Sequence, residues 1–249
     1  SIKDYFWKEI KKKNINFIGV VPTILQAIYI NSSKIKKIQF LKFFGCGSSI
    51  LSKELQIKFE KKFHTKIANI YGMSEIGVAS LDNTNSKKRK IGSIGENLKG
   101  VKIKLFKNKN KVVSDNTIGE IGIKTPAIFS GYIPNKKINF LNNKGYFMSG
   151  DLAVKKDKHF FFIDRSKDLI IKGGVNISPQ EIDDCLNSNN KVFESASISK
   201  QDNFFGEDIK SYVVLKNGYK AKKSELMNFC KKKIGQYKTP SEIVFVKQL

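Results

Sequence analysis

The stretch Phe17-Ile18-Gly19-Val20-Val21-Pro22 shows the pattern that decides the fold. An apolar run of strand length is followed at once by proline, a residue that the first turn of a helix tolerates. The pattern continues with a strand at residues 40–44, a helix with one apolar face at residues 55–63, and a strand at residues 67–70. Alternating strands and helices of this kind predict a parallel sheet covered by helices.

The pattern changes twice further along the chain. Residues 92–164 contain short alternating segments separated by Gly, Asn and Pro, which predict an antiparallel sheet or a small β-barrel. After them comes a stretch of mixed strands and helices, in which Ser178-Pro179-Gln180-Glu181 is a capping box that begins a helix. We therefore predict an α/β protein in three parts, which span residues 1–91, 92–165 and 166–249.

The chain has a formal net charge of +24, from 46 basic and 22 acidic residues. Only Arg89 and Arg165 among the basic residues are arginines, and the lysines are spread along the whole sequence. Base recognition and bidentate phosphate binding favour arginine. We therefore expect a solvated lysine surface and no specific nucleic-acid partner. The alternative is a polyanion-binding role, or weak contact with an anionic membrane surface.

The three cysteines, Cys46, Cys185 and Cys230, are widely spaced and indicate neither a disulfide framework nor a zinc cluster. No apolar run approaches the roughly 18–20 residues that a membrane-spanning helix needs. These features predict a globular protein of the reducing cytoplasm. They leave its oligomeric state open.

The segment Ile70-Tyr71-Gly72-Met73-Ser74-Glu75 carries the most chemical information. An aromatic residue at a strand end can stack on a base, a hydroxyl can bind a phosphate oxygen, and a carboxylate can hold Mg²⁺. The alternative is an ordinary strand-to-helix turn in which Ser74 is the N-cap. Spacing alone favours this alternative.

Two further segments place polar residues next to glycines. Asp151 follows Gly150 at a predicted strand end, where a carboxylate can accept both hydroxyls of a ribose. Residues 164–182 contain Arg165, an apolar strand, the pair Gly173-Gly174 and the capped helix.

Together these segments resemble the adenylate-forming superfamily, which includes acyl- and aryl-CoA ligases, luciferases and the adenylation domains of peptide synthetases. Ser74 and Ser149 stand where the family has threonine, so the hydroxyl groups are retained. The matching motifs follow the family's order along nearly the whole chain: Val21-Pro22-Thr23, Gly45 to Ile50, Tyr71 to Glu75, Gly92-Ser93-Ile94-Gly95, Gly119-Glu120-Ile121, Gly131-Tyr132, Ser149-Gly150-Asp151 and Asp164 to Glu181.

The resemblance implies the C-terminal part of a large adenylate-forming domain, with a parallel αβ subdomain and a small β-barrel, followed by a small mobile α+β domain. It also implies a two-step ligase. A carboxylate attacks the α-phosphorus of ATP to give acyl-adenylate and pyrophosphate, and coenzyme A then takes the acyl group as a thioester. The expected substrates and cofactors are thus a carboxylic acid, ATP, Mg²⁺ and CoA. An adenylation module that loads a carrier-protein thiol, and a non-catalytic nucleotide- or polyanion-binding protein, are the alternatives.

The resemblance assigns roles to single residues. Ser74 would contact the α-phosphate, Glu75 would ligate Mg²⁺, and Lys167 would be the hinge between the two domains. The nucleotide and CoA would be bound by Gly47, Ser48 and Ser49 (adenine pocket), Tyr71 and Gly72 (adenine stacking and close approach), Asp151 and Arg165 (ribose), and Gly173 and Gly174 (the loop that lines the pantetheine tunnel).

Two departures from the family pattern qualify these expectations. Nothing in the chain resembles the family's phosphate loop, and the sequence stops shortly before the position of its adenylation lysine. We therefore expect a fragment of a longer ligase. No arginine lies near the expected acyl-pocket residues in the sequence, which disfavours dicarboxylic acids as substrates. These residues are Val21, Gly45, Cys46, Gly72, Met73, Ile76 and Gly77.

Overall fold

The computed structural model describes residues 2–33, 35, 37–133, 141–157 and 159–249. The chain divides into two compact units. Unit 1 consists of residues 1–149 and 153–162, and unit 2 consists of residues 150–152 and 163–249. The division crosses two strands, so each of them contributes residues to both units.

The first sheet of unit 1 has the strand order β1-β2-β3-β4-β5. β1, β2 and β3 are parallel, as the alternating pattern predicts, whereas β4 and β5 continue the sheet in antiparallel pairing. The elements in chain order are α1 (Ile2–Lys12), β1 (Phe17–Val20), α2 (Pro22–Asn31), β2 (Phe43–Cys46), α3 (Lys53–Phe63), β3 (Lys66–Met73), β4 (Gly77–Leu81) and β5 (Glu96–Asn97).

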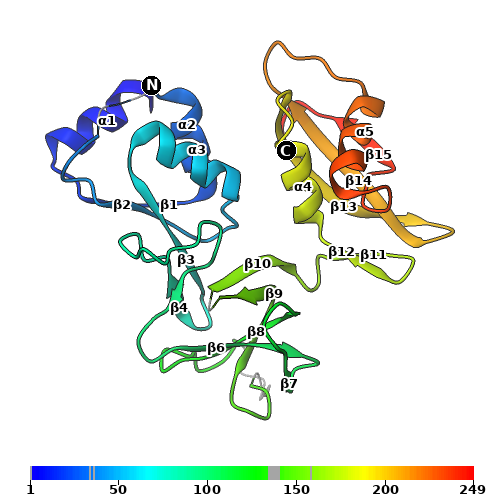
Figure 1. Ribbon diagram of the computed structural model, residues 1–249, viewed down its shortest axis with the longest axis horizontal. Helices are drawn as coiled ribbons and strands as arrows, with labels where there is room; N and C mark the ends of the chain where they lie inside the picture. Colours follow the sequence, from blue (N-terminus) through cyan, green and yellow to red (C-terminus); the bar gives the residue numbers. More distant parts are fainter. Residues whose placement is uncertain (1, 34, 36, 134–140, 158) are drawn as a thin grey trace. The chain divides into compact units, whose positions relative to one another are not determined.

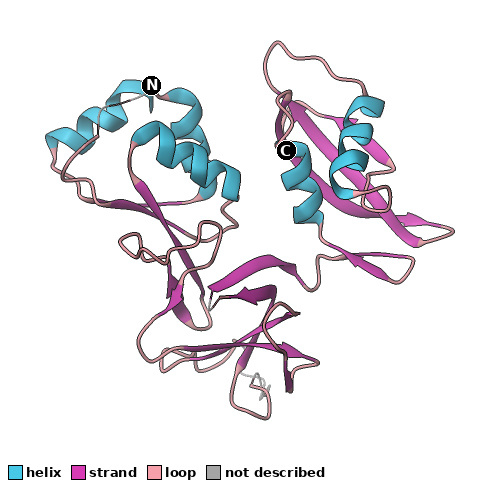
Figure 2. Ribbon diagram, in the orientation of Figure 1, coloured by secondary structure: helices cyan, strands magenta, loops and turns pink. Residues whose placement is uncertain are grey.

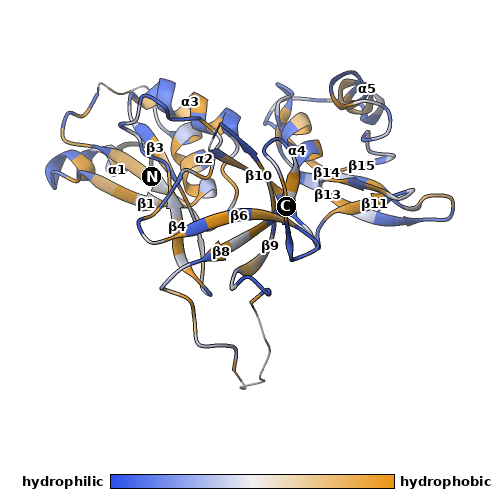
Figure 3. Cartoon of the chain, turned by 60° about the horizontal axis from the view of Figure 1, so that its bottom comes forward, coloured by the Kyte–Doolittle hydropathy of each residue, from blue (hydrophilic) through white to orange (hydrophobic). Residues whose placement is uncertain are grey.

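The three helices of unit 1 lie against the parallel strands (Figure 1). Their apolar faces form one core with β2 and β3, in which Trp7, Leu25 and Phe59 are at least 95% buried. The ribbon of α3 carries both hydrophilic and hydrophobic residues (Figure 3), as expected for a helix with one face in the core. This packing fixes the ends of the parallel strands.

The second sheet of unit 1 has the order β10-β9-β8-β6-β7. Within the described residues, the chain between α3 and α4 contains strands and loops but no α-helix (Figure 2), as the alternating segments predict. A second core joins this sheet to the β3–β4 hairpin through buried residues such as Tyr71, Ile76 and Ile121. The strands are β6 (Lys102–Lys107), β7 (Lys111–Val112), β8 (Ile118–Lys124), β9 (Phe147–Lys156) and β10 (His159–Arg165).

Unit 2 contains a sheet of order β12-β11-β14-β13, with β15 added in parallel to β14. α4 begins at Pro179, where the capping box predicts it, and the Ser178 hydroxyl accepts a hydrogen bond from the Glu181 amide. The Glu181 carboxylate pairs with Lys238. The elements are β11 (Ile170–Lys172), β12 (Val175–Ile177), α4 (Pro179–Asn187), β13 (Val192–Asp202), β14 (Gly206–Leu215), α5 (Lys223–Ile234) and β15 (Glu242–Phe245).

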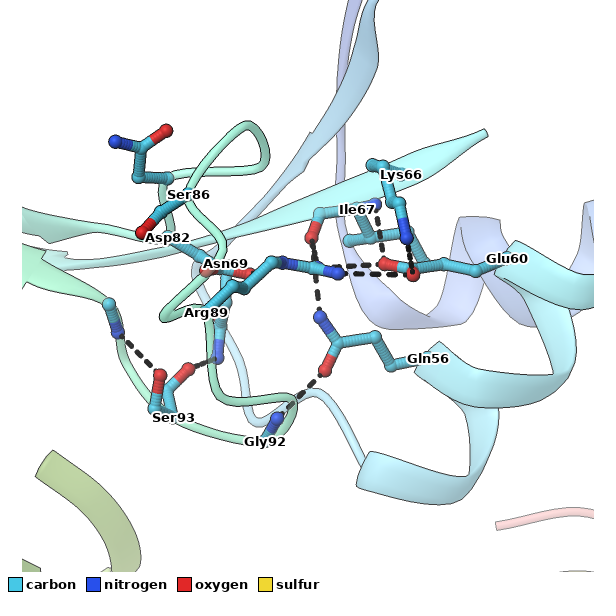
Figure 4. Close-up of polar contacts among 12 residues, drawn as sticks. Gln56, Glu60, Lys66, Ile67, Asn69, Asp82, Ser86, Arg89, Gly92 and Ser93 are labelled. Carbon is cyan, nitrogen blue, oxygen red and sulfur yellow. Dashed lines mark hydrogen bonds and ion pairs between the residues drawn. The ribbon is translucent and has the colours of Figure 1, made fainter. Parts of the chain in front are cut away.

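A buried ionic cluster fixes the loop between β4 and β5. The Arg89 guanidinium lies between Glu60 on α3 and Asp82, as Figure 4 shows, at 2.7 Å from Glu60 Oε1 and 2.6 Å from Asp82 Oδ2. It also donates to the Ile67 carbonyl at 2.5 Å. Burial raises the pKa of Asp82, and Arg89 offsets part of that rise. The cluster joins α3, β3 and the loop.

Candidate functional site

The carboxyl ends of the three parallel strands meet at one edge of the first sheet. In the register of the sheet, Val20 pairs with Cys46 and Cys46 pairs with Asn69. The Gly47 amide then donates to the Val20 carbonyl at 3.3 Å. A Cβ on Gly47 would lie 3.0 Å from the Ile70 carbonyl oxygen, so the backbones approach closely here. Ligands of α/β sheets bind at such edges.

The turn after β3 contains two of the predicted site residues. β3 ends at Met73 and β4 starts at Gly77, so Ser74 and Glu75 lie in a hairpin turn, closed by a 3.1 Å bond from the Ile76 amide to the Met73 carbonyl. The alternative of a strand-to-helix turn with Ser74 as N-cap is therefore wrong. A side chain at Gly72 would meet the Gly77 carbonyl oxygen at 2.4 Å, so only glycine fits.

The Glu75 carboxylate is held by a residue from a distant segment. The Tyr132 hydroxyl donates to Glu75 Oε1 at 3.0 Å, and the Phe129 amide donates to the Glu75 carbonyl at 2.8 Å. The pKa of Tyr132 is raised mainly by burial and further by the Glu75 carboxylate. The hydroxyl therefore stays protonated and can donate. Two motifs that are separate in the sequence are thus in contact.

The other predicted residues of unit 1 differ in exposure. Ser74 is exposed, and Ser48 adopts a left-handed backbone conformation with φ of 67° beside exposed Ser49. Tyr71 is only 9% exposed, because its ring belongs to the core between the hairpin and the second sheet. Stacking on a base would have to use the small accessible part of this residue, so that role stays a prediction.

The predicted ribose ligands lie next to one another in unit 2. Arg165 Nε is 3.5 Å from Asp151 Oδ1, and the Asp151 side chain is 8% exposed against 59% for Arg165. The Ser166 amide donates to the Gly150 carbonyl at 2.8 Å, and Gly150 has φ of 76°. A buried carboxylate beside an exposed guanidinium suits a polar ligand that approaches from solvent.

Lys167 and the glycine pair both lie in turns of unit 2. Lys167 is exposed in the turn between β10 and β11, and its hinge role stays a prediction. Gly173 and Gly174 connect β11 and β12 as a two-residue hairpin, with φ of 52° and 81°, as a type I′ turn requires. The short strand β12 separates this pair from α4.

One family of enzymes accounts for this arrangement. The sequence pattern of the AMP-binding enzyme family matches residues 1–133, and that of the AMP-binding enzyme C-terminal domain matches residues 181–249. The chain belongs to the AMP-binding enzyme family. The resemblance to adenylate-forming enzymes is thereby confirmed.

The relatives that resemble this chain include CoA ligases. An oxalate–CoA ligase of Saccharomyces cerevisiae is 31% identical over 98% of this chain and 46% of its own length. A sulfoacetate–CoA ligase of Cupriavidus necator is 30% identical over 98% of this chain and 48% of its own. The structure of ATP-bound MatB from Rhodopseudomonas palustris superposes with a TM-score of 0.83 at 25% identity, over 94% of this chain and 47% of that one. The chain thus spans about half the length of these relatives.

Three side-chain roles were not predicted from the sequence. Tyr132 enters only as part of a Gly-Tyr pair, and Arg89 only as one of two arginines, with no structural role. The third is Tyr237, whose hydroxyl donates to the Lys172 carbonyl. The rarity of arginine in so basic a chain is the one signal that could have singled out Arg89.

Proposed function

We propose that the protein carrying this chain is an ATP-dependent acyl-CoA ligase that forms AMP. A carboxylate oxygen bonds to the α-phosphorus of ATP and pyrophosphate leaves; the CoA thiol then bonds to the acyl carbon and AMP leaves. The observation that carries this proposal is the hairpin turn at the carboxyl edge of the parallel strands, where Tyr132 holds Glu75 beside exposed Ser74. The CoA ligases among the relatives support it.

The turn after β3 suits the phosphate groups of a nucleotide. In the proposal, the Ser74 hydroxyl donates to an α-phosphate oxygen and Gly47, Ser48 and Ser49 border the adenine. Within the described ranges, no three His, Cys, Asp or Glu side chains gather as a metal cluster. Mg²⁺ bound to a nucleotide needs only one or two carboxylates, because phosphates and water complete its shell. Glu75 fits that need, and the metal would neutralise charge on the phosphates.

Unit 2 supplies the ribose contacts and the second step. Asp151 would accept the ribose hydroxyls, with Arg165 beside it. Lys167 would change its backbone conformation between adenylation and thioester formation, and the turn at Gly173 and Gly174 would line the path of pantetheine. A turn without side chains leaves room for a narrow ligand.

The acid is the open part of the proposal. No arginine lies near the expected acyl-pocket residues in the sequence, which argues against dicarboxylic acids, whereas one relative is named for oxalate. Within the described residues, no helix is long and apolar enough to cross a membrane. We propose a cytoplasmic location, which the three free and buried cysteines support.

The test uses the full-length natural protein and measures the two half-reactions separately. Carboxylic acids from oxalate to long-chain fatty acids are screened for ATP–pyrophosphate exchange, and the active ones are then tested with CoA. Asp151→Ala should raise the KM for ATP and slow both half-reactions. If none of the acids supports pyrophosphate exchange in a protein that still binds ATP, the proposed ligase function is contradicted. Transfer to a carrier-protein thiol but not to CoA would favour the alternative adenylation module.

A further inference from the structure

Three contacts from distant segments converge on the start of the Gly173–Gly174 turn. The Tyr237 hydroxyl, from the loop between α5 and β15, donates to the Lys172 carbonyl at 2.7 Å. The Gly173 amide donates to the Phe205 carbonyl at 2.9 Å. The Lys172 ammonium lies 2.6 Å from Asp208 Oδ1. The backbone is therefore held on both sides of the peptide that enters the turn.

The side chains around these bonds form one packed group. The Lys172 side chain is 8% exposed, and its ammonium lies 5.1 Å from the centre of the Phe205 ring and 5.4 Å from that of Tyr237. The two rings meet edge to face at 6.1 Å. A buried lysine that is paired with a carboxylate and covered by two rings has little freedom to move. The group therefore gives the Tyr237 hydroxyl a defined position.

The two glycines differ in their surroundings. A Cβ on Gly173 would lie 2.7 Å from the Tyr237 hydroxyl oxygen, whereas a Cβ on Gly174 would meet nothing within 4 Å. Both residues have positive φ. Tyr237 thus occupies the space beside the first glycine and leaves the second one open.

We propose that Tyr237 is a positioning residue of the thioester-forming step. It fixes the Gly173–Gly174 turn through the Lys172 carbonyl, so that the open side of the turn can receive pantetheine. This inference rests on the proposed ligase function. It requires that loss of the Tyr237 hydroxyl affects the CoA-dependent step and leaves adenylation intact.

The first experiment measures the turn itself and needs no activity. Tyr237→Phe removes one hydroxyl and keeps the ring. Loss of one such hydrogen bond should speed amide exchange in a peptide covering residues 170–177 by about three- to tenfold. Tyr219→Phe is the matched control, because Tyr219 is 48% exposed in the loop after β14, and it should leave the exchange unchanged. Equal exchange in the two variants would overturn the inference.

A second variant pair tests the geometry. Gly173→Ala should destabilise unit 2 more than Gly174→Ala, because only its Cβ meets the Tyr237 hydroxyl. The extra loss of stability caused by Gly173→Ala should be smaller in a protein that also carries Tyr237→Phe. A double-mutant cycle measures this difference. An additive cycle would contradict the proposed contact.

The functional readout compares half-reactions in the full-length protein. Tyr237→Phe should raise the KM for CoA and slow acyl-CoA release from preformed adenylate by about three- to tenfold, with pyrophosphate exchange unchanged. Equal loss in both assays, or no loss in either, would overturn the positioning role. If the wild-type protein makes adenylate but no acyl-CoA, the proposed ligase function fails instead. That outcome does not depend on what amide exchange shows about the turn.

Discussion

The Tyr132 hydroxyl bonds to Glu75 across 57 positions of sequence, at a distance of 3.0 Å. The contact connects the turn after β3 with the segment that follows β8, and a 2.8 Å bond from the Phe129 amide to the Glu75 carbonyl supports it. A carboxylate that ligates a metal is usually oriented by such a partner. Tyr132 therefore orients Glu75, the proposed Mg²⁺ ligand, and is not itself a proposed ligand.

Tyr132→Phe should raise the Mg²⁺ concentration that supports half-maximal pyrophosphate exchange by about tenfold, because the ligand loses the group that orients it. The maximal rate at saturating Mg²⁺ should change less. Tyr219→Phe serves as the control for loss of a tyrosine hydroxyl. An unchanged Mg²⁺ dependence would show that Glu75 does not ligate the metal or that Tyr132 does not orient it.

Lys167→Pro should slow one half-reaction much more than the other. Proline fixes its own φ and restricts Ser166, whose amide donates to the Gly150 carbonyl at 2.8 Å. If Lys167 passes between two backbone conformations, proline should raise the free energy of the one that does not fit its fixed φ by about 1–3 kcal/mol. We expect thioester formation to be slowed more than pyrophosphate exchange. Lys167→Ala should retain both steps, and equal losses for the proline variant would rule out the hinge.

Arg89→Ala should destabilise unit 1 by about 3–5 kcal/mol, because it leaves the Glu60 and Asp82 carboxylates buried without their cation. Arg89→Lys should cost less but should not restore wild-type stability, since an ammonium lacks the planar fork that bonds both carboxylates. The change in the free energy of unfolding is measured by urea denaturation, which the fluorescence of Trp7 monitors. Trp7 is the single tryptophan of the 249 residues. Lys88→Ala, at an exposed neighbour, should be neutral. Near-neutral behaviour of Arg89→Ala would contradict the cluster's structural role.

Asp183→Asn should change how the stability of unit 2 depends on pH. Burial raises the pKa of Asp183 to about 7, although hydrogen bonds from Ser197 and Ser195 oppose the rise. The folded state therefore binds its proton more tightly than the unfolded state, so this group's contribution to stability falls as pH rises from about 4 to about 7. The variant should be more stable than wild type above pH 7, by about 1–3 kcal/mol, and no more stable near pH 4.

Chemical denaturation at pH 4, 6 and 8 measures this dependence. Asp168→Asn makes the same charge change on an exposed turn and serves as the control. Parallel stability curves for Asp183→Asn and wild type would show that the carboxyl group is not buried in the way described.

The order of strands and helices could be predicted from the sequence because each buried element has its own apolar period. The helix at Pro179 follows from the Ser178 cap in the sequence, and the structure confirms it. The hairpin after β3 could not be predicted in this way. Ser74 followed by Glu75 is equally typical of a helix start, and the decisive contact is between the Gly72 position and the Gly77 backbone.

The remaining site contacts are long-range. Glu75 with Tyr132, and Lys172 with Tyr237, join residues 57 and 65 positions apart. Arg89 is flanked by lysines in the sequence, yet its side chain is 7% exposed. Local patterns of hydropathy describe which residues are buried on one element. They do not describe which polar side chains meet after several elements have packed.

The hairpin after β3 has an electrostatic consequence. β1 and β2 lead into α2 and α3, whereas β3 turns back as β4. A helix start would present aligned peptide dipoles, equivalent to roughly half a positive charge, to an anion. The turn at Ser74 and Glu75 has no such macrodipole and contributes a negative carboxylate instead. A polyphosphate at this turn must therefore bring its own counterion, and its affinity there should rise with the concentration of divalent cation.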